Sequence, residues 1–381
     1  MALSFPLTAL LSIGVVAQPA VPAVPGERRA PGGKPLVIAH RGASALRPEH
    51  TLAAYAKAIE DGADFIEPDL VITRDGVPVA RHENEISGTT DVASHARFAA
   101  RRTTRRIDGE EISGWFVEDF SLAELRELRA RERLPALRGT EFDGRYSVPT
   151  FQEIVELAAR LSRTHGRTIG LIPELKHPGY FRSIGLDPEK AALRVILRNA
   201  YARQASVGIQ SFEVESLRKL RAALGQRHPN VFLVQLIGDP QRLPHDRETA
   251  GDLRHTYASM LTPTGMAAIA SYAEVIAPPA RLVVPVNARG ALAKPTELVA
   301  TAHAAGLKVH VWTLRPENAF LPAQLRCGDD PAARCEAGAL TEARALLAAG
   351  VDGFFTDDPA LGRRAVDALD IGNGKKEGRQ H

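Results

Sequence analysis

Short β-rich runs alternate with amphipathic helical stretches from about residue 36 almost to the end of this 381-residue chain. Several of the helical stretches end at a glycine that the next strand follows at once. This alternation is typical of a parallel α/β architecture, and nine candidate strands would fill an eight-stranded (β/α)8 barrel with one left over. The candidate strands are residues 36–40, 64–70, 78–82, 168–174, 206–210, 231–235, 274–277, 308–313 and 353–356.

The helical stretches carry apolar residues at helical spacing. Thr51 has the side chain of an N-cap, and the pattern that follows it runs to Asp61 and Gly62. The sequence T-R-D-G at 73–76 predicts a turn, so one strand beside it is expected to be a hairpin arm or an extra strand. Further helices are predicted over residues 150–163, 188–201, 215–224, 295–305 and 341–349.

The alternation stops between residues 84 and 148. We interpret this stretch as a cap region inserted into a barrel domain that spans residues 35–370. It contains a run of four arginines at 101–106 and a short helix capped by Ser121. Because the net charge is only +3 and no aromatic residues interleave with the arginines, a solvated loop is favoured over a nucleic-acid partner.

The two ends and the cysteines indicate the compartment. Residues 1–23 resemble a signal peptide whose apolar stretch is too short to span a bilayer, so no stable membrane insertion is expected. A Pro- and Gly-rich linker at 24–34 follows, and residues 371–381 are predicted to be a disordered tail. Cys327 and Cys335 could close a small disulfide loop, which would persist only in an oxidising compartment. A periplasmic or secreted protein is therefore expected.

Carboxylates stand at the predicted strand ends, where a barrel of this kind places its active site. Glu67 and Asp69 are two residues apart, so on a strand they share one face, and Glu174 would bring a third carboxylate. Burying such a cluster needs a cation. Oxygen-only ligands suit Ca²⁺, Mg²⁺ or Mn²⁺ better than zinc.

Histidines and cations stand beside these carboxylates. His40 and His82 would be the acid and base, while Arg41 and Lys176 suit the oxygens of a phosphoryl group. A single histidine at a strand end is more often structural, and carboxylates there often cap a helix. Polar groups at four successive strand ends nevertheless need a ligand, and the set favours phosphoryl transfer.

Motifs along the chain resemble those of the glycerophosphodiester phosphodiesterase family. They are H-R-G-A-S-x-x-x-P-E-H-T from His40, E-P-D-L, V-x-R-H-E, P-E-L-K, V-H-V-W-T and G-F-F-T-D-D-P. The segment S-G-T-T-D-V-A, the long insertion and R-Y-S-V-P-T-F-Q-E-I look most like the periplasmic bacterial branch.

The resemblance implies a distorted TIM barrel and a divalent cation on Glu67, Asp69 and Glu174, commonly Ca²⁺ in this branch, with Mg²⁺ as the alternative. His40 and His82 would be the acid/base pair, in an order that the sequence does not assign. The implied substrates are small glycerophosphodiesters, that is, deacylated phospholipid headgroups. The implied products are sn-glycerol 3-phosphate and an alcohol.

The resemblance also suggests residues around the glycerol. Phe212 and Trp312 would form an aromatic wall; core packing is the alternative for both, and it explains Trp312 equally simply. Gln210 could orient polar groups in the mouth, and Glu49 is expected to support the site from beside the first helix.

Two other functions stay open at this point. One is a diesterase for lysophospholipids or teichoic acid, which would need a wider and partly apolar mouth. The other is a catalytically inactive phosphodiester-binding protein. The sequence does not predict an oligomeric state.

Overall fold

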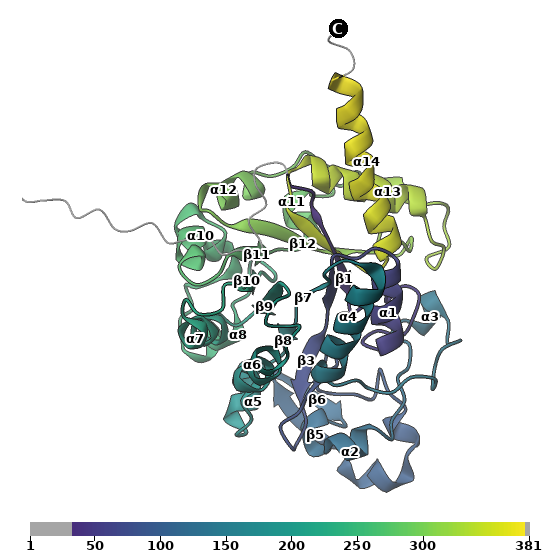
Figure 1. Ribbon diagram of the computed structural model, residues 1–381, viewed down its shortest axis with the longest axis vertical. Coiled ribbons are helices and arrows are strands. Elements are labelled where there is room, and N and C mark those ends of the chain that lie inside the picture. Colours follow the sequence, from purple (N-terminus) through teal and green to yellow (C-terminus); the bar gives the residue numbers. More distant parts are fainter. Residues whose placement is uncertain (1–32, 378–381) are drawn as a thin grey trace, which may run out of the picture.

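The computed structural model describes residues 33–377 and closes eight parallel strands into a barrel. The strands pair in the order β1, β2, β7, β9, β10, β11, β12, β13 and back to β1. Figure 1 shows the strands at the centre with helices arranged around them, so the predicted (β/α)8 class is confirmed. The barrel strands are β1 (Leu36–His40), β2 (Phe65–Glu67), β7 (Gly170–Leu171), β9 (Val207–Ser211), β10 (Val231–Leu236), β11 (Val275–Ala277), β12 (Lys308–Leu314) and β13 (Gly353–Thr356).

Prolines divide two of the predicted strands. The stretch 64–70 is not one strand, because β2 ends at Glu67 and β3 (Asp69–Ile72) begins after Pro68. The stretch 168–174 likewise divides into β7 and β8 (Glu174–Leu175) around Pro173. Proline has no N–H to donate to a sheet, so pairing changes there, and β3 and β8 pair with each other.

The extra strand is a hairpin arm. β4 (Pro78–Ala80) runs antiparallel to β3, and the predicted turn joins them, with the Gly76 N–H donating to the Thr73 carbonyl at 2.9 Å. His82 therefore follows the returning arm, and the prediction that it ends a barrel strand is wrong. The hairpin still brings it back to the site, because the Arg81 N–H donates to the Asp69 carbonyl at 3.0 Å.

The predicted helices are present, with some shifted ends. Thr51 caps α1 by accepting a hydrogen bond from the Ala54 N–H at 3.1 Å. α13 begins at Glu336 rather than at residue 341, and Gly338 in its first turn admits the Leu325 carbonyl oxygen, which would lie 1.9 Å from an added Cβ. These helices are α1 (Leu52–Glu60), α4 (Phe151–His165), α6 (Pro188–Arg198), α7 (Val214–Leu224), α12 (Leu298–Ala304) and α13 (Glu336–Ala348). The other helices are α2 (Leu122–Leu125), α3 (Pro135–Arg138), α5 (Pro178–Ser183), α8 (His245–Thr249), α9 (Tyr257–Met260), α10 (Pro263–Ala270), α11 (Ala280–Val283) and α14 (Pro359–Glu377).

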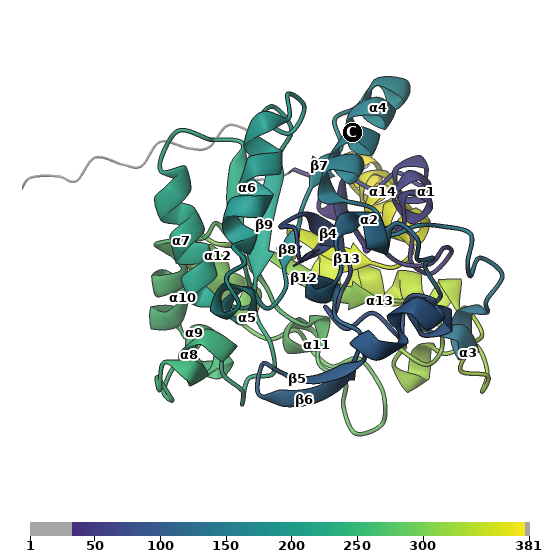
Figure 2. The same ribbon diagram turned by 90° about the horizontal axis from the view of Figure 1, so that it is seen from below.

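Residues 84–148 form a unit against one side of the barrel, seen low in Figure 1 and again in Figure 2. It contains the hairpin of β5 (Thr103–Ile107) and β6 (Glu110–Gly114), four 3-10 or α-helical segments before residue 126, and α3. Its apolar side chains, Phe98 and Phe120 among them, pack with those of β3 and β4 in one buried cluster.

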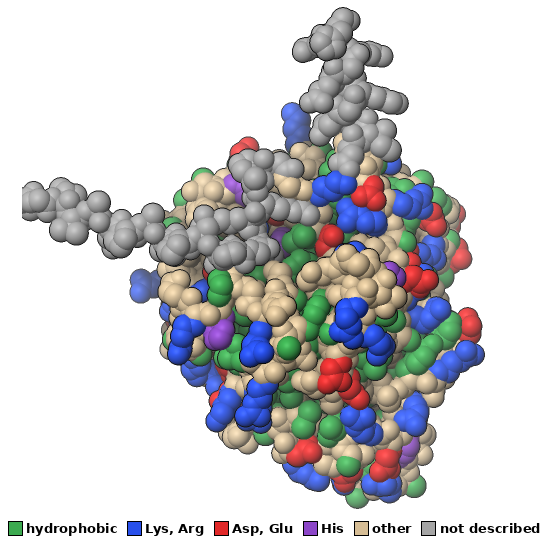
Figure 3. Space-filling view, in the orientation of Figure 1, with side chains coloured by type: hydrophobic (Ala, Val, Ile, Leu, Met, Phe, Trp, Pro, Cys, Tyr) green, Lys and Arg blue, Asp and Glu red, His purple; other side chains and the backbone are tan. Residues whose placement is uncertain are grey.

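The arginine run of this unit is partly ion-paired. Arg101 binds Glu124 and Arg105 binds Asp119, each at 2.5 Å. On the face shown in Figure 3, basic and acidic side chains are interspersed rather than segregated. These contacts give the run a structural role in holding the inserted unit together.

The predictions for the two ends of the chain have different outcomes. The predicted signal peptide, 1–23, and nearly all of the linker, 24–34, lie outside the described residues. α14 continues to Glu377, so the backbone at 371–377 is helical rather than irregular; no proline interrupts it. Among residues 33–377, no helix combines the length and apolarity that crossing a bilayer requires.

A disulfide joins Cys327 and Cys335, whose Cα atoms are 5.3 Å apart. The loop that it closes is tied to the segment before it by Asn318. The side-chain amide of this residue donates to the carbonyls of Gly328 and Asp330 at 3.2 and 2.9 Å. The neighbouring Glu317 is thereby held at the barrel mouth.

Candidate active site

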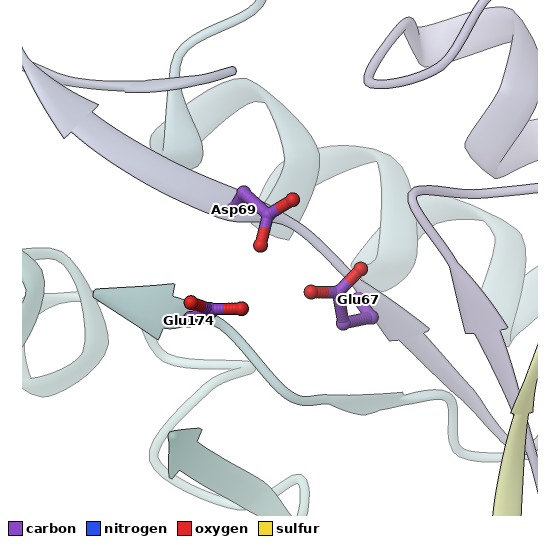
Figure 4. Close-up of side chains that lie close together, drawn as sticks. All are labelled: Glu67, Asp69 and Glu174. Carbon is purple, nitrogen blue, oxygen red and sulfur yellow. The ribbon is translucent and has the colours of Figure 1, made fainter. Parts of the chain in front are cut away.

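Three carboxylates converge where β2, β3 and β8 meet. Glu67, Asp69 and Glu174 are all buried, and one oxygen of each lies within 4.8 Å of the others. Figure 4 shows the three side chains pointing toward a shared space, two from the purple strands and one from the teal strand. The predicted cluster is therefore assembled, across the two proline breaks rather than along one strand.

The positively charged side chains around the cluster do not balance the negative charge that its three carboxylates would carry if all were ionised. Burial raises the pKa of Glu67 well above its ordinary value, and the charges of Asp69 and Glu174 raise it further. Burial also raises the pKa of Glu174 to about 8, although Lys176 opposes the shift from 2.8 Å. For Asp69 burial acts in the same direction but is outweighed by Lys176, His82 and His50, which leave its pKa lowered.

A divalent cation fits this donor set. It would let all three carboxylates ionise together, and hard oxygen ligands match Ca²⁺ and Mg²⁺. A further oxygen is available beside them: Gln210 donates its amide N–H to Glu67 at 3.1 Å, while its buried Oε1 has no hydrogen-bond partner among the described residues. The geometry thus supports a metal site and leaves the identity of the ion open.

The two histidines face the same small pocket, and each has a carboxylate on Nδ1. His40 Nδ1 lies 2.6 Å from Asp357 Oδ1, and His82 Nδ1 lies 2.5 Å from Glu83 Oε1. Ionised carboxylates only accept hydrogen bonds, so Nδ1 carries the proton in each pair and Nε2 is left for a substrate.

Burial and nearby cations keep both histidines neutral. Burial, followed by the charge of Arg41, lowers the pKa of His40 to about 4. The pKa of His82 is lowered by burial and by the charges of Arg41 and Lys176. Both imidazoles are therefore able to accept a proton in the free protein at neutral pH.

Arg41 is placed by an unusual turn after β1. Its φ is +59° and that of Gly42 is +87°, which aims the Arg41 N–H at Glu67 Oε2, 2.8 Å away. Its guanidinium binds Glu49 at 3.0 Å and lies 3.3 Å from Asp69. Glu49 takes the supporting position expected of it.

The predicted aromatic residues close one side of the pocket, which has a volume of about 140 Å³. Phe212 and Trp312 pack edge to face with centroids 6.2 Å apart, and the Trp312 indole N–H donates to the Ala277 carbonyl at 2.8 Å. Phe355 completes this wall, so every predicted site residue lies at one pocket or in its carboxylate cluster.

Sequence reasoning missed several supporting residues. Glu83 and Asp357 stand inside the motifs V-x-R-H-E and G-F-F-T-D-D-P, and position beside a motif histidine could have indicated the first. His50, in P-E-H-T, binds Asp69 through Nε2 at 2.9 Å. Arg133 and Arg138 lie in the insertion, where no local pattern marks them.

Comparisons with known proteins show which family the chain belongs to. A family model described as the glycerophosphoryl diester phosphodiesterase family matches residues 40–361. The chain belongs to this family. It is accordingly a hydrolase of the phosphodiesterase class.

Similar proteins extend over most of the chain. A glycerophosphodiester phosphodiesterase of Arabidopsis thaliana is 33% identical over 85% of this chain and 84% of its own length. One from Haemophilus influenzae is 28% identical over 64% of this chain and 68% of its own length.

Solved structures share the fold. A Silicibacter pomeroyi protein has a TM-score of 0.59 at 24% identity, covering 89% of this chain and 94% of its own. A phosphodiesterase of Oleispira antarctica, solved with the product sn-glycerol-3-phosphate, has a TM-score of 0.53 at 21% identity, covering 88% of this chain and 97% of its own.

Proposed function

We propose that this member of the family hydrolyses small glycerophosphodiesters to sn-glycerol 3-phosphate and an alcohol. The observation that carries the proposal is the pairing of two histidines, each oriented by a carboxylate, with three clustered carboxylates at one pocket. An acid, a base and a cation site within one barrel mouth are the groups that phosphodiester cleavage needs.

The two cavities at the mouth fit the two halves of such a substrate. The smaller pocket has an apolar wall of Phe212, Trp312 and Phe355 for the carbon face of glycerol. Arg41 and Lys176, which also line it, would offset the charge of the diester oxygens. A second cavity of about 390 Å³ shares Glu174, Lys176 and Phe212 with the first and would receive the alcohol.

The histidines would move the protons. One, with Nε2 free, takes the proton of the glycerol 2-hydroxyl as its oxygen attacks phosphorus. The other takes up a proton at Nε2 when the anionic diester binds beside it, and gives that proton to the departing alcohol oxygen. Water then opens the cyclic phosphate with the two roles exchanged, which returns both histidines to their starting state. A bound cation, Ca²⁺ in this proposal with Mg²⁺ as the alternative, would polarise the diester oxygens and offset their charge.

Export to the periplasm or the medium is also part of the proposal. The disulfide between Cys327 and Cys335 supports an oxidising compartment. A lysophospholipid or teichoic acid diesterase remains the second candidate, because the larger cavity combines charged side chains with apolar ones such as Ile107, Ile112 and Leu243.

A substrate panel tests the proposal. Purified protein with Ca²⁺ or Mg²⁺ is assayed for release of glycerol 3-phosphate from glycerophosphocholine and glycerophosphoethanolamine, and for release of choline from lysophosphatidylcholine. We expect turnover of the first two, lost on chelation and in Glu67→Ala. Turnover of the lysophospholipid alone would favour the second candidate, and tight binding without turnover would support an inactive binding protein.

A further inference from the structure

A short segment of the insertion, residues 133–138, reaches the carboxylate partners of both histidines. It begins at Arg133 and ends with α3, whose last residue is Arg138. These two arginines lie in a part of the chain that sequence patterns place outside the barrel. Their contacts, however, are with the barrel mouth.

Arg133 joins the two carboxylates nearest His82 and Arg41. Its guanidinium binds Glu83 in bidentate fashion, at 2.9 and 2.6 Å, and Glu49 in the same fashion, at 2.7 Å for both bonds. Glu83 in turn accepts from His82, and Glu49 accepts from Arg41. One side chain, 26% exposed, thus fixes the orientation of a histidine partner and of an arginine partner.

Arg138 makes the equivalent contact behind His40. Its Nη2 donates to Asp357 Oδ2 at 2.6 Å, while Oδ1 of the same carboxylate accepts from His40. Its Nε donates to Glu317 at 2.8 Å, and its Nη1 donates to the Ser44 carbonyl at 2.8 Å. Arg138 is only 7% exposed, and each of its three nitrogens donates to an oxygen.

We infer that Arg133 and Arg138 are positioning residues for the acid/base pair, and that the insertion is therefore part of the catalytic apparatus. A carboxylate that orients a histidine must keep one oxygen on Nδ1 and remain ionised. A guanidinium bound to the carboxylate, at both oxygens in Glu83 and at the second oxygen in Asp357, secures both conditions. The single point charge of lysine does this less well. Without Arg133, Glu83 could turn toward solvent at the mouth and leave His82 free to rotate.

The competing explanation is that these ion pairs only fasten the insertion to the barrel. Both explanations predict some loss of stability when Arg133 is replaced. Only a positioning role predicts that the loss of kcat depends on whether Glu83 is present. Because this inference rests on the proposed function, the wild-type protein must first turn over glycerophosphocholine with Ca²⁺. A failure there would count against the proposed function and not against the positioning.

A double-mutant cycle with Arg133→Met and Glu83→Gln tests the inference. We expect Arg133→Met to lower kcat about 10- to 100-fold, as loss of such orienting partners commonly does, and to change KM less. In the Glu83→Gln background the same change should lower kcat by a clearly smaller factor, because only its bonds to Glu49 then remain to be lost. In the Asp357→Asn background, Arg133→Met should lower kcat by the same factor as in the wild-type protein.

Controls separate positioning from folding. Arg131→Met, two residues away at an arginine that is 53% exposed, should keep wild-type kcat. Arg133→Lys should recover part of the activity, and guanidinium ion should rescue Arg133→Ala. Arg138→Lys is preferred to Arg138→Met, since the methionine would leave buried carboxylates unpaired. Arg138→Lys should lower kcat by the same factor in the wild-type and Glu83→Gln backgrounds.

Two results would overturn the inference. One is an Arg133→Met protein with the kcat of Arg131→Met. The other is an equal loss of kcat from Arg133→Met in the wild-type and Glu83→Gln backgrounds. A residue that acts through Glu83 must have a smaller effect once Glu83 is changed.

Discussion

At the scale of single residues, each histidine depends on the carboxylate behind it. Asp357 is the partner of His40, and the charges of Arg315 and Arg138 outweigh burial to hold its pKa well below the ordinary value. Asp357→Asn removes the ionised acceptor and lets the imidazole take the wrong tautomer. We expect kcat to fall by about 10²-fold or more. Asp358→Asn, which changes the adjacent carboxylate that caps α14, should lower stability but keep kcat per folded molecule; equal activities for the two variants would contradict the pairing.

The lowered pKa of His40 makes the free energy of unfolding depend on pH. Its pKa is about 4 in the folded protein, against an ordinary 6.5, so between these values the unfolded chain binds a proton that the folded protein does not. The free energy of unfolding therefore decreases as the pH falls from 6.5 toward 4. Between pH 7 and pH 5 this histidine should remove about 2 kcal/mol. Urea denaturation of the chelated protein measures it: His40→Gln should lose less stability than wild type over this range, and identical losses would refute the assignment.

At the scale of elements, the turn between β1 and α1 determines where Arg41 lies. Gly42 has a φ of +87°, and an added Cβ would lie 2.7 Å from the Ala54 carbonyl carbon. Gly76, in the β3–β4 turn, has a φ of +78° with no atom within 4 Å of such a Cβ. Gly76→Ala should cost about 1 kcal/mol for backbone strain alone, and Gly42→Ala clearly more, with loss of activity. Thermal unfolding and kcat of both variants test this, and equal costs would show that α1 can shift to make room.

The disulfide loop is the second element that supports the site. The loop holds Glu317, whose carboxylate accepts a hydrogen bond from Arg138. Arg138 in turn binds Asp357. Closing a loop of this length contributes about 2–3 kcal/mol by restricting the unfolded chain. A protein with both cysteines changed to serine should unfold at lower urea concentration, and reductant should then have no further effect on it. Wild-type protein that is equally stable with and without reductant would contradict this role.

At the scale of the whole molecule, periodicity was enough to predict the barrel. Alternation of strand and helix, glycine stops and the Thr51 cap are local signals, and they identified β1, β9, β10 and most helices. Residues at strand ends were predictable too, because every parallel strand of a closed barrel ends at the same mouth. The breaks at Pro68 and Pro173 do not follow from periodicity, because the apolar runs on either side of each proline join into one continuous pattern.

The supporting residues could not be predicted in the same way. Arg138 contacts Asp357 across 219 positions of sequence, and no spacing rule links an insertion to a distant strand end. His82 lies at the pocket, but a hairpin and not a barrel strand brings it there. Three-dimensional packing supplies these contacts, whereas the sequence shows only the residue types that make them possible.

We expect cleavage to require one divalent cation on Glu67, Asp69 and Glu174. The most direct test titrates Ca²⁺ into chelated protein and measures bound ion and the initial rate on glycerophosphocholine in the same samples. Glu174→Gln is compared with Glu342→Gln, which changes a buried carboxylate outside the site. We predict that rate and bound ion rise together to one ion per chain in wild type and Glu342→Gln, and that both are lost in Glu174→Gln. Full activity in the chelated protein, or in Glu174→Gln without bound ion, would contradict the account.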